Sequence, residues 1–191
     1  MKSTSLILSA RFAAVLLAIP VFASAQEATA PTTPAAPASA AKPKPLAPAD
    51  KKFFKDVSEA MLVEQKLAGL AKQGSTNDAV KKLGETITAD VGKAWTPFAT
   101  LSQTKGAELT PDISKADQSN ATKLGKVAAD KFDKEFLKDL GKETKKTGRL
   151  LDSAKSLQDP ELKQWLETWG PTLKGHEAAV QKVEKEVGGK K

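Results

Sequence analysis

Apolar side chains recur at alternating intervals of four and three residues through the last helical segment of the chain, from Leu162 to Val187. This spacing is typical of an α-helix that packs one side against neighbouring helices. The only histidine of the chain, His176, falls on the repeat. The repeat is Leu162, Leu166, Trp169, Leu173, His176, Val180, Val183 and Val187. The spacing therefore predicts that the histidine faces the interior of a helical bundle.

Helical spacing also marks four earlier segments, three long and one short. With the last segment included, the predicted helices cover approximately residues 50–74, 76–105, 115–129, 133–158 and 160–187. No segment has the alternating pattern of a strand, and no hairpin dipeptide separates two apolar runs. We therefore predict an all-α fold, an antiparallel four-helix bundle with one extra short helix.

Residues at the helix boundaries support these segments. Asp50 is predicted to cap the first helix, and Gly106 is predicted to end the second. Asp159 followed by Pro160 is a start signal, because a proline in the first turn loses no helical hydrogen bond. Pro97 lies inside the second helix, where it predicts a kink.

The first 25 residues have the pattern of a signal peptide. Lys2 and Arg11 precede an apolar run at 12–22, and the small residues at 23–25 form a cleavage site. We predict export with Gln26 as the mature N-terminus; the alternative is an uncleaved membrane anchor. Cleavage removes two positive charges, so the formal charge of +7 falls to +5. The predicted location is the periplasm or the outer membrane, or outside the cell.

Residues 26–49 are rich in alanine and proline and contain few large apolar side chains. Such a composition cannot offset the entropy of ordering, so we predict a disordered linker with polyproline II character. It is interpreted as a passive spacer, or as a contact for anionic envelope polymer through Lys42 and Lys44. The folded domain is then predicted at residues 50–187.

Four short patterns, taken in order, resemble an exported bacterial family known as domain of unknown function 4142. They are the run Glu64, Leu67, Leu70 and Ala71, the pairs Phe132-Asp133 and Phe136-Leu137, the run 159–163, and Pro171, Leu173 and His176. The resemblance covers roughly residues 53–183 and implies a ferritin-like bundle, often labelled as an outer-membrane protein. It also implies an Asp-His pair on the second helix and another histidine on the fourth. Here Val91 follows Asp90, and Thr144 follows Glu143.

Glu64 and His176 are the candidate metal ligands, with Glu143 or Asp90 as further candidates. A di-metal centre in a helical bundle uses several carboxylates together with histidines from facing helices, and this set falls short of that. The alternative for His176 is a core histidine bonded to Glu64, to a threonine hydroxyl or to a carbonyl freed by Pro171. Glu64 either pairs with His176 or reaches water at the edge of the buried face. We hypothesise the pair, because an unpaired buried carboxylate is costly.

The sequence excludes several chemistries. There is no cysteine, so disulfides and thiol nucleophiles are absent. No nucleotide-binding glycine motif and no hydrolase or zinc-protease motif occurs. We predict no cofactor. We also predict no nucleic-acid partner, because acidic residues interleave with the lysines at 138–146.

Two functional hypotheses remain. The first is a non-catalytic envelope protein that binds an unknown envelope protein or polymer, or acts as a stress-related accessory. The second is a ferritin-like metal-binding or oxidase-type protein with a degenerate site.

Overall fold

The computed structural model describes residues 45–189. The predicted signal peptide and most of the predicted linker lie outside this range. Within it the chain forms five α-helices and one short 3-10 helix, and no strand. The helices are α1 (Pro48–Gly74), α2 (Asp78–Lys105), α3 (Lys115–Leu124), α4 (Ala129–Asp152) and α5 (Pro160–Gly188), with η1 (Ala154–Ser156) between the last two.

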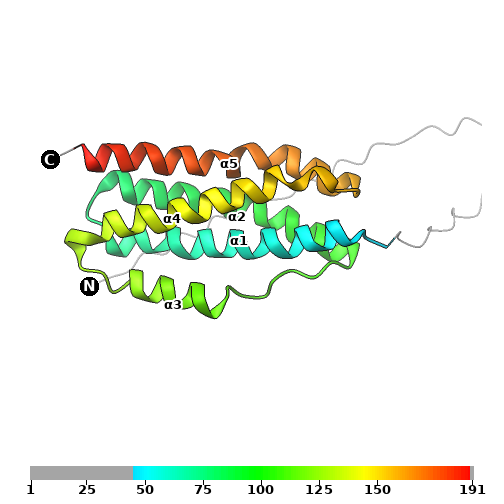
Figure 1. Ribbon diagram of the computed structural model, residues 1–191, viewed down its shortest axis with the longest axis horizontal. Helices are drawn as coiled ribbons and strands as arrows, with labels where there is room; N and C mark the ends of the chain where they lie inside the picture. Colours follow the sequence, from blue (N-terminus) through cyan, green and yellow to red (C-terminus); the bar gives the residue numbers. More distant parts are fainter. Residues whose placement is uncertain (1–44, 190–191) are drawn as a thin grey trace, which may run out of the picture. The chain divides into compact units, whose positions relative to one another are not determined.

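Four long helices form a bundle, which confirms the predicted fold class. α1 packs against α2 and α4, and α5 packs against the same two helices. α1 and α5 therefore lie diagonally across the bundle, as do α2 and α4. In Figure 1, α1 and α5 run from right to left and α2 and α4 run from left to right, so every adjacent pair is antiparallel.

The connection between α2 and α4 is the long one. Because these helices are parallel, the chain must return along the bundle, and residues 106–128 make this crossover (Figure 1). α3 lies within it and contacts α1 and α4 on the outside of the bundle. Ferritin-like bundles have one such crossover. A ferritin-like relationship stays a prediction here.

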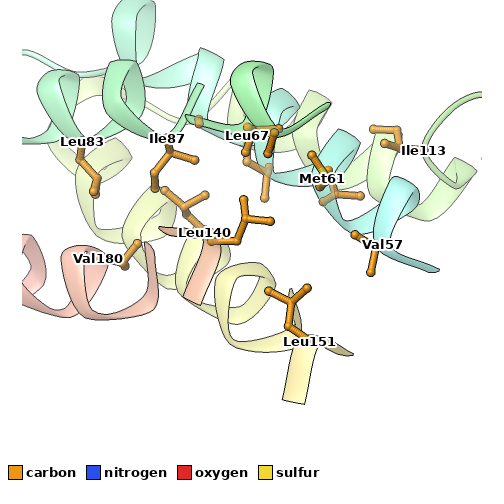
Figure 2. Packing of buried hydrophobic residues seen from close by; sticks show 14 of the residues in the cluster. Val57, Met61, Leu67, Leu83, Ile87, Ile113, Leu140, Leu151 and Val180 are labelled. Atoms are coloured by element: carbon orange, nitrogen blue, oxygen red, sulfur yellow. The ribbon is translucent and has the colours of Figure 1, made fainter. Parts of the chain in front are cut away.

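The core is built from one face of each long helix. Figure 2 shows Ile87, Leu140 and Val180 approaching one another from α2, α4 and α5. All three are at most 1% exposed. α1 and α2 approach closely at Gly84, where an added Cβ would lie 2.5 Å from the carbonyl oxygen of Ala68. A larger residue at position 84 would therefore force these two helices apart.

The predicted cap at Asp50 is wrong, because α1 begins two residues earlier at Pro48. Pro48 starts the helix without losing a hydrogen bond. Asp50 instead lies buried inside the first turn. Its carboxylate accepts hydrogen bonds from the backbone amides of Gln158 (2.8 Å) and Asp159 (3.2 Å), in the connection that leads into α5. A side chain predicted to cap the start of the first helix thus holds the segment that leads into α5.

The helix signals predicted at Gly106 and Asp159 are confirmed. Gly106 ends α2 in the left-handed region, at φ 63°. Asp159 caps α5 by accepting from the amides of Glu161 and Leu162. Pro97 lies inside α2, and the kink expected there stays a prediction.

On α5, the predicted buried face is confirmed at Leu162 and from Leu173 to Val183, whereas Val187 is only partly buried. Between Leu162 and Leu173, Trp165 is 5% exposed. Leu166 and Trp169 are only partly buried. The Trp165 indole donates to the Ala94 carbonyl oxygen of α2 at 3.1 Å, a contact that spacing alone cannot reveal.

No helix within residues 45–189 is both long enough and apolar enough to cross a membrane.

Replacement of Asp50 tests its role in fixing α5. Asp50→Ala leaves two backbone amides without their acceptor, which costs about 1–3 kcal/mol of unfolding free energy. Urea unfolding of the variant measures this loss. Asp56→Ala is the matched control, because that carboxylate is more exposed and pairs with Lys52 one turn away. The control is expected to lose no more than about 0.5 kcal/mol. Equal losses in the two variants would contradict the assigned role.

Candidate functional site

Glu64 and His176 meet in the centre of the bundle. The imidazole Nδ1 lies 3.0 Å from the carboxylate Oε2, at hydrogen-bond distance. Glu64 is 0% exposed and His176 is 3% exposed. These values confirm the hypothesised pair and exclude the alternative in which Glu64 reaches water. Because α1 and α5 are diagonal neighbours, the contact crosses the middle of the core.

The four-three spacing explains how both side chains reach this position. On α1, Glu64 follows Ala60 by four residues and precedes Leu67 by three, and both neighbours are buried. On α5, His176 follows Leu173 by three residues and precedes Val180 by four, again with both neighbours buried. Each polar group therefore lies on a face that packing turns inward.

Asp90 of α2 approaches the other ring nitrogen. Its Oδ2 lies 3.7 Å from Nε2 of His176, which is longer than a hydrogen bond. The Asp90 side chain is 25% exposed and also lies 3.8 Å from the Lys93 ammonium. Asp90 is thus at the rim of the site, and the ring nitrogen it approaches keeps no hydrogen-bond partner.

Glu143 of α4 lies on another side of the site. Its carboxylate is 3.5 Å from the Lys146 ammonium, and its side chain is 19% exposed. Burial raises the pKa of the Glu143 carboxyl above its usual range; the charge of Lys146 opposes this rise, and those of Asp117 and Glu64 add to it. The carboxylates of Glu64 on α1 and Asp117 on α3 therefore act electrostatically on Glu143 of α4.

Two atoms of the central pair remain unsatisfied. The Oε1 of Glu64 and the Nε2 of His176 are buried and have no hydrogen-bond partner in the described part of the chain. The hydroxyl of Thr147 on α4 is also buried without a hydrogen-bond partner among the described residues. Buried polar atoms without partners cost free energy. Burial of these two unpartnered atoms therefore lowers the unfolding free energy, and apolar side chains at the same positions would not have this effect.

The described residues do not assemble a metal site. Across residues 45–189, no group of three or more histidine, aspartate or glutamate side chains is arranged to hold a metal ion. The candidate ligands are brought near one another, but only Glu64 and His176 touch. The metal assignment for these residues stays a prediction.

Apolar and small side chains fill the positions where the resemblance implies histidines. Val91 on α2 is 1% exposed and Thr144 on α4 is 0% exposed, so both lie in the core. The Thr144 hydroxyl donates to the carbonyl oxygen of Gly141 in its own helix, at 3.3 Å. Neither residue supplies a ligand atom to the centre of the bundle.

A family model described as domain of unknown function (DUF4142) matches residues 35–183, most of the chain. The chain belongs to this family. The match confirms the resemblance read from the short patterns at Glu64, Phe132, Asp159 and His176. No curated protein and no solved structure matches this DUF4142 chain.

Asp50 and Trp165 were missed by reasoning from the sequence. Both make contacts between segments that are far apart in the chain, and neither contact leaves a local pattern. Pro48 could have indicated the correct position of Asp50. A proline is favoured in the first turn of a helix, so a helix that begins at Pro48 places residue 50 inside that turn.

The raised pKa of Glu143 predicts a pH dependence of stability. A carboxyl with a raised pKa in the folded state stabilises the fold at low pH, and this contribution is lost as pH rises past its ordinary value of 4.5. Glu143→Gln cannot ionise, so the variant should gain unfolding free energy relative to the parent protein as pH rises to neutral. Denaturant unfolding at a series of pH values measures the difference.

Glu135→Gln provides the matched control on the same helix. The hydrogen bond from Lys138 lowers the pKa of the exposed Glu135 carboxyl, so removal of its charge should not stabilise the fold at neutral pH. A Glu143 variant that shows no relative gain between acidic and neutral pH would refute the assigned burial effect.

Proposed function

We propose that this DUF4142 protein is an exported, non-catalytic helical bundle of the cell envelope that binds another envelope component. A stress-related accessory role is compatible with the same architecture. The observation that carries the proposal is the direct contact between Glu64 and His176. It uses the only histidine of the chain inside the core instead of presenting it to a substrate.

The geometry of the central pair supports a structural role. A catalytic acid or base must reach its substrate, yet both side chains are almost fully buried. Five surface hollows in the described part of the chain are lined by residues at the bundle ends, on α3, or between α2 and α5. None of these hollows includes Glu64 or His176 among its lining residues.

The N-terminal pattern supports export. The apolar run at 12–22, followed by small residues, is the pattern expected of the signal peptide of an exported protein. The proline-rich composition of residues 26–49 is typical of an extended spacer, which would hold the bundle away from a surface of the cell envelope. Binding to another envelope component is then the simplest use of a bundle whose single histidine lies in the core.

A metal-binding function is the second candidate. The unsatisfied Oε1 of Glu64 and Nε2 of His176 favour it, because both atoms are metal ligands in other proteins. Asp90 and Glu143 could complete such a set only if their side chains moved toward the histidine. The contact between Glu64 and His176 would have to open as well.

Metal content decides between the two functions. The full gene, including its signal sequence, is expressed without a histidine tag, and the protein is recovered from the envelope fraction. We expect Gln26 as its first residue and no stoichiometric iron, manganese or zinc. His176→Ala should lower the unfolding free energy by about 3–5 kcal/mol, because it leaves a buried carboxylate unpaired.

Lys174→Ala is the control for the histidine variant. It lies on the same helix, is partly exposed and pairs with Asp152, so its loss should change stability by no more than about 1 kcal/mol. One bound metal per chain that disappears in the His176 variant would overturn the structural role. Recovery of the protein from the cytoplasm with residues 1–25 intact would overturn export.

A further inference from the structure

We propose that the groove between α2 and α5 binds a neutral polysaccharide strand. The inference rests on the proposed binding function and names the class of partner. The groove is shallow and open, has a volume of about 410 Å³, and is lined mainly by Thr100, Leu101, Thr104, Gln164, Thr168 and Trp169. These residues come from two helices that each contain an internal proline, Pro97 in α2 and Pro171 in α5.

The lining of the groove is almost uncharged. Charged residues make up 28% of the chain, yet Glu161 is the one charged residue among those that line the groove. The Nζ of Lys105 lies 2.7 Å from Oε1 of Glu161, so the charge of this carboxylate is already paired. Such a surface offers no ion pair to an acidic or basic partner, and it therefore favours a neutral one.

The polar groups of the groove are mainly acceptors. The hydroxyls of Thr100, Thr104 and Thr168 each donate to a carbonyl oxygen one turn earlier in their own helix, at 2.8–3.0 Å. Their hydrogens are used, but their oxygens can still accept. A partner that fits them must bring donors, and the hydroxyl groups of a sugar supply donors along a chain.

Trp169 supplies the apolar part of the surface. Its ring packs partly against the core and leaves part of its surface open to the groove. Next to it, Trp165 is fixed by its hydrogen bond to Ala94. An indole combines a flat apolar face with a polar N–H, which matches the C–H face and the hydroxyl rim of a sugar ring.

A protein partner fits the groove less well. An amphipathic helix needs a continuous apolar groove, and here the exposed threonines and Gln164 interrupt the apolar side chains. A second copy of the chain would meet the same surplus of acceptors. The excess of acceptors and the absence of free charge together favour the polysaccharide.

Binding of neutral tetrasaccharides to the mature full-length chain tests the proposal. The probes are cellotetraose, maltotetraose and chitotetraose, and calorimetry and saturation-transfer NMR of the sugar are the readouts. We expect saturable binding of at least one of them. Trp169→Ala should weaken it about tenfold, because one aromatic stacking surface is lost.

Two controls separate the groove from general effects of mutation. Trp95→Ala removes another partly buried tryptophan, also packed against the core, that does not line the groove, so binding should be unchanged. Thr168→Val keeps the shape but removes an acceptor, so it should weaken binding even if the Trp169 variant does not fold.

Three results would overturn the proposal: no saturable binding of any probe, equal weakening by the Trp95 and Trp169 variants, or a dimer that depends on Trp169. These results leave the proposed function standing, since a metal-free, exported bundle can bind a different component. Stoichiometric metal at His176, by contrast, would refute the proposed function without any change in sugar binding.

Discussion

The hydrogen bond between Glu64 and His176 is the interaction on which the centre of this bundle depends. It joins two diagonal helices across the core, whereas most contacts among the described long helices run between adjacent pairs. A carboxylate that is 0% exposed would be very costly without this partner. The pair also restricts how α1 and α5 can slide, because a one-turn shift would separate the two groups and bury both without partners.

Around this centre, apolar and small side chains fill the core positions where the resemblance implies histidines. Val91 and Thr144 fill core positions next to Asp90 and Glu143, and their side chains pack well enough to be almost completely buried. Family membership and the helical bundle are shown, and residues 45–189 contain no group of three or more side chains arranged to hold a metal ion. A shared fold is by itself weak evidence for a shared chemistry.

Much of the fold and part of the site could be predicted from helical spacing. The positions of Glu64 and His176 on buried faces followed from intervals of three and four, and the capping role of Asp159 followed from local chemistry. The first half of α5 could not be predicted in this way. There, Trp165 is buried because its indole finds the Ala94 carbonyl on another helix, and that partner is 71 residues away. The role of Asp50 could not be predicted for the same reason, because the backbone amides that it binds lie more than 100 residues later in the chain.

A double-mutant cycle between Glu64 and His176 tests the central claim most directly. Each single leucine variant leaves one buried polar partner alone, whereas the double variant replaces the pair by apolar side chains. The account predicts that Glu64→Leu with His176→Leu is more stable than either single variant, with a coupling of about 1–3 kcal/mol in the unfolding free energy. Additive losses, with the double variant the least stable of the three, would contradict it.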